Sequence, residues 1–171
     1  MGVPVKYGKG FEPLAVAVEG RALVRLDPVT GELVCPFKDP LQVRAWIVAL
    51  ARKLMVGETR ELEIKHTFLD GIYMREMFIP KGTLLVGKVH RQGCINVVSK
   101  GDISVLTETG SARVKAGYSI VSPAGIQKVG FAHEDTVFVN VFRTDETDPE
   151  KIESVVAIDP DEGEKLCQLD G

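Results

Sequence analysis

Between residues 61 and 143 the chain alternates short apolar segments with turn residues, and this pattern constrains the fold more than any other feature. The segments with strand composition are ELEIKHTF, IYMREMFI, TLLVGKVH, INVVS, DISVLTE, SARVK, YSIVS and TVFVNVFR. Turn-forming pieces such as DG, PKG, RQG and PAG separate them, and no helical period intervenes. Short strands at such even spacing are typical of an antiparallel sandwich or barrel, so an all-β dominated domain is predicted for residues 61–144.

Residues 1–60 are predicted to form an extension outside this domain, a hairpin followed by one helix. LAVAVEGRALVRL and ELVCPF flank DPVTG, whose Asp, Pro and Gly favour a turn. Asp39 is placed to accept a hydrogen bond from a free amide at a helix start, and Pro40 suits the first helical position. Residues 145–171 are acidic and polar, so we expect a mobile tail with a short helix over DPEKIESVV.

The net charge, the N-terminal sequence and the cysteines restrict the expected binding partners and the expected cellular location. The formal net charge of −3 and the pI of about 5.7 argue against general attraction to nucleic acid or to an anionic membrane. The start MGVPVKYGKG lacks the apolar core of a signal peptide, and WIVALARKLMV is too short and too charged to span a bilayer. The cysteines, Cys35, Cys94 and Cys167, are odd in number and far apart, which favours a reducing, cytoplasmic location without disulfides.

Two stretches place glycines, a proline and polar residues at regular intervals. In GTLLVGKVHRQGCINVVSKG, the spaced positions are Gly82, Lys88, His90, Cys94 and Gly101. The second stretch covers residues 117–132, and its spaced positions are Gly117, Pro123, Gly125, Lys128 and Ala132. The glycines and the proline suit the turns between short strands, whereas the other positions are where chemistry would be expected.

This spacing resembles the two motifs of the cupin superfamily, G-x5-H-x-H-x3-4-E-x6-G and G-x5-P-x-G-x2-H-x3-N. The glycines and the proline match throughout, but of the four usual metal ligands only His90 is present. The resemblance covers roughly residues 61–143, and it is nearest to small cupin proteins of tailed phages and prophages. It implies a double-stranded β-helix, the RmlC-like jelly-roll barrel, and a phage or prophage origin.

Three uses of the barrel interior are open. Residues two apart in a strand face the same way, so Lys88 and His90 are expected to point inward together. Ammonium groups in a small barrel need anionic partners or lowered pKa values, which favours a pocket for a small polar or anionic ligand. The predicted ligand-binding residues are Lys88, His90, Cys94, Asn96, Lys128 and Arg75. Alternatively, each lysine reaches out of the barrel mouth and Glu76 or Glu134 neutralises the remaining charge.

The second use is a rearranged site for zinc or iron(II). Imidazole and thiolate are good ligands for these metals, so the candidates are His90, Cys94, His66 and His133, with a carboxylate from Glu76 or Glu134. The positive charges of Lys88 and Lys128 oppose a bound dication. The third use is acid–base catalysis, as in metal-free cupin epimerases, by His90 or His66 with Glu76 and with Tyr73 or Tyr118.

Of these, we favour a non-catalytic pocket with no cofactor. In a phage setting it would sequester a host metabolite or nucleotide signal, or serve in the virion or its assembly. The alternative is a metal-dependent or acid–base enzyme of isomerase, epimerase or dioxygenase type that acts on a sugar or small acid. Because such barrels leave a sheet face exposed, a homodimer or higher homo-oligomer is expected.

Overall fold

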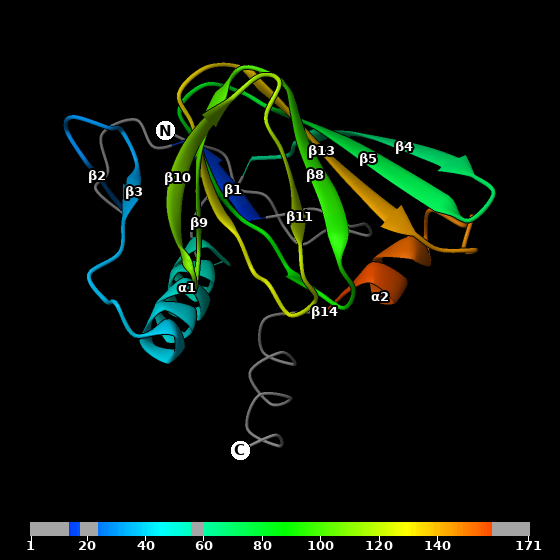
Figure 1. Ribbon diagram of the computed structural model, residues 1–171, viewed down its shortest axis with the longest axis horizontal. Coiled ribbons are helices and arrows are strands. Elements are labelled where there is room, and N and C mark those ends of the chain that lie inside the picture. Colours follow the sequence, from blue (N-terminus) through cyan, green and yellow to red (C-terminus); the bar gives the residue numbers. More distant parts are fainter. Residues whose placement is uncertain (1–13, 18–23, 56–59, 159–171) are drawn as a thin grey trace.

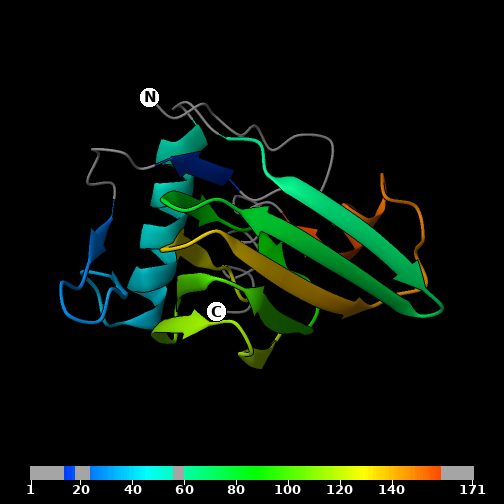
Figure 2. The ribbon, with the colours of Figure 1, turned by 90° about the horizontal axis from the view of Figure 1, so that it is seen from above.

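A computed structural model describes residues 14–17, 24–55 and 60–158. Two sheets face each other in it (Figures 1 and 2). The first consists of β1 (Leu14–Ala17), β6 (Thr83–Val86), β12 (Val129–Ala132), β9 (Asp102–Thr107) and β10 (Gly110–Lys115), in that order. The second consists of β11 (Ser119–Ser122), β8 (Cys94–Lys100), β13 (Thr136–Arg143), β5 (Ile72–Ile79) and β4 (Glu63–Leu69).

The strand order is that of a jelly roll. Along the chain, β5, β6, β8, β9, β10, β11, β12 and β13 divide into the spatial orders β5-β13-β8-β11 and β6-β12-β9-β10. All of these neighbours are antiparallel, and the first and last strands of the series lie side by side. This is the arrangement of two Greek keys in a double-sheet jelly roll, so the predicted double-stranded β-helix is confirmed.

Three apolar clusters hold the barrel together. One lies between the sheets and includes Met77, Leu85 and Phe138. A second lies where α1 (Pro40–Met55) covers the other side of the first sheet, with Leu84 packed among residues of the helix. The third closes one end of the barrel and includes Phe142. Alternation along β6 explains the division, because Leu84 and Leu85 point to opposite faces of the sheet.

The N-terminal extension is partly built into the barrel. The helix starts as predicted, and the Gln42 amide donates to Asp39 Oδ1 over 3.1 Å. The predicted hairpin is shorter than expected, with β2 (Arg25–Leu26) and β3 (Leu33–Val34) around the DPVTG turn. Its first segment was placed wrongly, because β1 pairs with β6 at the edge of the first sheet instead. Residues 18–23 lie outside the described residues.

Two strands of the barrel depart from the sequence prediction. TLLVGKVH was expected to be one strand, but it is divided into β6 and β7 (Val89–His90). Strand β12 was not predicted at all, since Gly130 at its centre weakens the strand pattern. A Cβ at Gly130 would lie 2.9 Å from Leu85 Cδ2 and 3.3 Å from Ile103 Cδ1, so a larger residue there would displace the ends of these two side chains.

Part of the predicted acidic tail packs against the barrel. The expected short helix is present as α2 (Ile152–Val156), and β14 (Ala157–Ile158) pairs with β7. Ile152 is fully buried, so apolar burial fixes this segment at one end of the barrel (Figure 1). Residues 159–171 lie outside the described residues. Within the part of the chain that the structure describes, no helix has the length and apolar character needed to cross a membrane.

Candidate functional site

A row of polar residues crosses the inner face of the second sheet. The pairing register places His66 opposite Arg75, Arg75 opposite Asn140, and Asn140 opposite Asn96. These residues come from β4, β5, β13 and β8, which are consecutive neighbours in the sheet. Because cross-strand partners share a face, four polar side chains fall in one line among apolar residues.

Hydrogen bonds connect this row from one strand to the next. The Arg75 guanidinium donates through Nη2 to Asn140 Oδ1, and Asn140 Nδ2 donates to Asn96 Oδ1 over 2.7 Å. Asn96 Nδ2 donates to Ser122 Oγ over 2.8 Å and to the Ile120 carbonyl over 3.3 Å. Arg75, Asn96 and Asn140 are all buried, and buried polar groups are stable only when their hydrogen bonds are made.

His90 and Cys94 meet at one side of this row. His90 Nδ1 lies 3.3 Å from Cys94 Sγ, and Sγ lies 3.5 Å from Asn96 Oδ1. Burial, reinforced by the positive charges of Lys128 and Arg75, lowers the pKa of His90 to about 2. Burial also raises the pKa of the Cys94 thiol. His90 is therefore a neutral imidazole beside a protonated thiol, a pair suited to hydrogen bonding rather than to charge.

Basic side chains line the small cavity at the centre of the barrel. This inner cavity has a volume of about 50 Å³, and Arg75, Lys88 and Lys128 line it together with His90. No Asp or Glu is among the described residues that line it. Burial lowers the pKa of Lys128 to about 8 and that of Arg75 to about 10, because the charged form loses hydration there.

The two lysines differ in their partners. The Lys88 ammonium forms an ion pair with Glu153 of α2, so the C-terminal segment supplies the balancing charge. Glu76 and Glu134 had been the expected carboxylates, but Glu76 pairs with Lys65 on the outer face, over 2.8 Å. The Lys128 ammonium is buried and has no hydrogen-bond partner among the described residues.

The four candidate metal ligands do not come together. His90 and Cys94 are adjacent, but His66 Nδ1, on the edge strand β4, contacts the hydroxyl of Tyr73 on β5 at 2.8 Å. His133 Nε2 contacts Ser104 Oγ at 2.8 Å in a separate network. Among the described residues, no three His, Cys, Asp or Glu side chains are grouped so that they could hold a metal ion.

The candidate acid–base set is likewise dispersed. Tyr73 is fully buried and bonded to His66, and burial raises its pKa to about 12. Tyr118 lies partly exposed, in the wall of a different pocket. Since Glu76 faces outward, no carboxylate from β5 orients either histidine.

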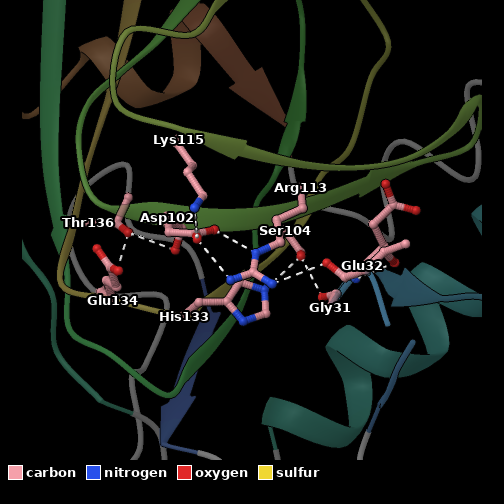
Figure 3. A network of polar contacts seen from close by, with 10 residues as sticks. Gly31, Glu32, Asp102, Ser104, Arg113, Lys115, His133, Glu134 and Thr136 are labelled. Carbon is pink, nitrogen blue, oxygen red and sulfur yellow. Dashed lines mark hydrogen bonds and ion pairs between the residues drawn. The ribbon is translucent and has the colours of Figure 1, made fainter. Parts of the chain in front are cut away.

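His133 belongs to a network that fastens the β2–β3 turn to the barrel (Figure 3). Arg113 holds the buried Asp102 carboxylate with two bonds of 2.8 and 2.9 Å and donates to the Thr30 carbonyl. Ser104 Oγ donates to the Gly31 carbonyl over 2.7 Å. Hydrogen bonding from Arg113 lowers the pKa of Asp102, so the carboxylate stays ionised as the structural centre of this network.

Sequence reasoning named Arg75, Asn96, Lys88 and Lys128 but missed two residues that determine their environment. Asn140 links Arg75 to Asn96, and its signal was present, since it falls on the inward positions of TVFVNVFR between two phenylalanines. Glu153 had no comparable signal, because it lies in a segment whose docking depends on tertiary contacts.

We compared the chain with known protein families, curated sequences and solved structures. No protein-family model matches the chain, and no curated protein sequence matches it. Among solved structures, KdgF from Halomonas is 16% identical with a TM-score of 0.44, over 52% of this chain and 89% of that protein. A cupin-like protein from Thermotoga maritima is 13% identical with a TM-score of 0.43, over 48% and 68% of the two chains.

An RmlC-like cupin with a double-stranded β-helix fold, from Methanocaldococcus jannaschii, is 12% identical with a TM-score of 0.43. The match covers 54% of this chain and 85% of that one. The fold assignment rests on the strand order described above, and the chemistry of the site rests on the residues of this chain.

The depressed pKa of His90 predicts a loss of stability in mild acid. Below pH 6.5 the unfolded chain takes up a proton on this imidazole while the folded barrel does not, so protonation favours unfolding. Through His90 alone, the free energy of unfolding should fall by about 1.4 kcal/mol for each unit by which the pH drops between 6.5 and the folded-state pKa. Urea denaturation at pH 7, 6 and 5 measures the slope. A His90→Gln variant should show a shallower slope, and an unchanged slope would contradict the assignment.

Proposed function

We propose that the barrel binds a small anionic molecule in its interior and does not catalyse a reaction on it. The observation that carries the proposal is the lining of the inner cavity: three basic side chains and, among the described residues, no carboxylate. The Lys128 ammonium is buried and has no hydrogen-bond partner among the described residues, and a bound anion would remove the cost of that burial.

The balance of charge supports an anion rather than a metal. Glu153 offsets Lys88, while Lys128 and Arg75 contribute positive charge to the same interior. Burial is the main cause of the lowered pKa of His90, and the positive charges of Lys128 and Arg75 lower it further. A cation would meet repulsion there, whereas an anion would be attracted.

Binding without turnover fits the state of the polar groups. The His90 imidazole is neutral and the Cys94 thiol is protonated, so neither is prepared as a base or a nucleophile near neutral pH. In the phage or prophage setting that the motif resemblance implies, such a protein would sequester a host metabolite or nucleotide signal, or would serve in the virion or its assembly. The protein would then act in the cytoplasm, and we expect it to be a homodimer or a higher homo-oligomer.

Lys128→Met is the direct test of this proposal. Acetate and inorganic phosphate, each titrated into the wild type, should raise its melting temperature as binding to the folded state requires. The variant should lose most of that response. Lys65→Met is the matched control, since Lys65 is exposed on the outer face. Equal responses of the two variants, or no response of the wild type, would contradict the proposal.

The affinity for acetate should fall as the pH rises above 8. Lys128 has a pKa of about 8 in the free barrel, and a bound anion raises that pKa by favouring the ammonium form. Above pH 8 the free protein must first take up a proton, so the dissociation constant should rise by up to tenfold per pH unit. Calorimetry between pH 7 and 9.5 measures this, because acetate itself stays ionised throughout. A constant affinity over that range would exclude Lys128 as the partner.

A further inference from the structure

A second and larger pocket opens beside the inner cavity. It has a volume of about 340 Å³, against about 50 Å³ for the inner cavity. Lys128, Val105 and Phe138 line both, so the two spaces meet at these side chains. The outer pocket lies within the size range of sites for small organic ligands, whereas the inner cavity holds no more than a few atoms.

The wall of the outer pocket is apolar, with some hydroxyl groups. Val98, Ile126 and Phe138 form part of it, and Tyr118 and Ile120 are partly exposed at its surface. The hydroxyl groups come from Thr107, Thr109, Ser111, Ser122 and Tyr118. Among the described residues that line this pocket, Lys128 is the only one with a charged side chain. An apolar space with one cation at its inner end is suited to an amphiphilic anion.

From this geometry we propose that the ligand is a small organic monocarboxylate with an apolar body. Its carboxylate would accept hydrogen bonds from the Lys128 ammonium at the junction of the two spaces. Its hydrocarbon part would lie in the outer pocket against Val98, Ile120 and Phe138. This inference rests on the proposed anion binding and adds the chemical class of the ligand.

The donors at the junction favour a carboxylate over a phosphate ester. A phosphate group carries more charge and takes several donors at once. Near Lys128, however, Asn96 Nδ2 already donates to Ser122 and Ile120, and Asn140 Nδ2 donates to Asn96. Lys88 is engaged by Glu153, and the Arg75 guanidinium donates to Asn140. A single ammonium matches a single carboxylate, and a nucleotide would leave most of its phosphate oxygens unpaired.

The test compares four probes on the full-length protein by calorimetry: acetate, hexanoate, hexanamide and adenosine monophosphate. Hexanoate adds four methylene groups to acetate, and their burial should tighten binding at least tenfold. Hexanamide keeps the chain but lacks the charge, so it should bind at least tenfold more weakly than hexanoate. Adenosine monophosphate should bind more weakly than hexanoate.

Two matched variants test whether the hydrocarbon chain of hexanoate lies in the outer pocket. Ile120→Glu puts a carboxylate into the wall of the outer pocket, whereas Ile95→Glu makes the same change at a similarly exposed position that lines neither space. Ile120→Glu should weaken hexanoate at least tenfold more than Ile95→Glu does, and melting curves check that both variants fold.

The outcomes separate the two proposals. If acetate and adenosine monophosphate bind through Lys128 but hexanoate is no tighter than acetate, the carboxylate inference is overturned and anion binding stands. If hexanoate binds equally well to both glutamate variants, the assignment of the outer pocket is overturned. If none of the anions binds to the wild type, both proposals fail together.

Discussion

Replacing Asn140 by leucine is expected to lower the free energy of unfolding by about 3 kcal/mol. Asn140 is almost fully buried, accepts a hydrogen bond from the Arg75 guanidinium, and donates one to Asn96. Leucine is of similar size, so the loss should come from polarity rather than from a cavity. The change removes an acceptor from a buried guanidinium and a donor from a buried amide, and each loss costs more than an ordinary hydrogen bond gains.

A double variant tests whether this explanation is right. Arg75→Met/Asn140→Leu removes the buried charge together with its acceptor, so it should be more stable than Asn140→Leu alone by about 1–2 kcal/mol. Urea denaturation of the wild type, both single variants and the double variant gives the coupling energy between the two positions. Additive losses would show that the Arg75–Asn140 contact contributes nothing beyond the separate packing of its members.

The barrel could be predicted from sequence because its signals are local. Strands such as β5 and β13 alternate between buried and more exposed positions, and turn residues separate them. The motif glycines have positive φ angles where the turns need them, at Gly82 and Gly117 among others. Each of these features is readable without knowledge of the remaining chain.

The elements that were missed depend on partners distant in sequence. Strand β12 includes Gly130, which lowers the local strand preference, and the strand forms through its pairing with β6 and β9. Helix α2 had a visible local pattern, but nothing local indicated that Ile152 would be buried against Tyr73 and Phe142. Glu153 is brought to Lys88 by that docking alone.

Several residues of the site were predicted from the sequence, but their hydrogen-bond and ion-pair partners were not. Lys88 and His90 line the cavity as expected, although Lys88 lies between β6 and β7 and not within one continuous strand. The sequence could not show that Glu153 pairs with Lys88, or that Lys128 has no hydrogen-bond partner among the described residues. It also could not exclude His66 and His133 from the cavity, because only their contacts with Tyr73 and with Ser104 in the folded chain show that they lie elsewhere.

The geometry suggests how this barrel differs from a metal-binding one. At the positions that resemble the cupin motifs, Lys88 and Lys128 stand where imidazoles would be expected, and Arg75 and a row of amides lie on the sheet beside them. These substitutions replace groups that donate electron pairs to a cation with groups that donate hydrogen bonds to an anion. The two lysines lie just before β7 and β12, and under the proposed function these segments would hold an anion.

Gly101→Ala is expected to destabilise the barrel by about 3–4 kcal/mol, since two costs add. Gly101 has a φ of +89°, a conformation in which an alanine is strained by about 1–2 kcal/mol. Its Cβ would also lie 2.5 Å from the Asp135 carbonyl oxygen and 2.7 Å from Thr136 Cα. Both are backbone atoms at the start of β13, so they cannot move aside as the end of a side chain would.

The same substitution at Gly117 distinguishes the cost of the strained backbone conformation from the cost of the steric collision. Its φ of +93° is nearly the same, but a Cβ there would meet no atom within 4 Å. Gly117→Ala should therefore lose only the conformational part, about 1–2 kcal/mol, and the difference between the two variants isolates the collision with β13. Chemical denaturation of both variants measures it. Equal losses would mean that the turn at Gly101 can relax away from Asp135, and that its glycine is required for backbone conformation rather than for close packing of β13 against the turn.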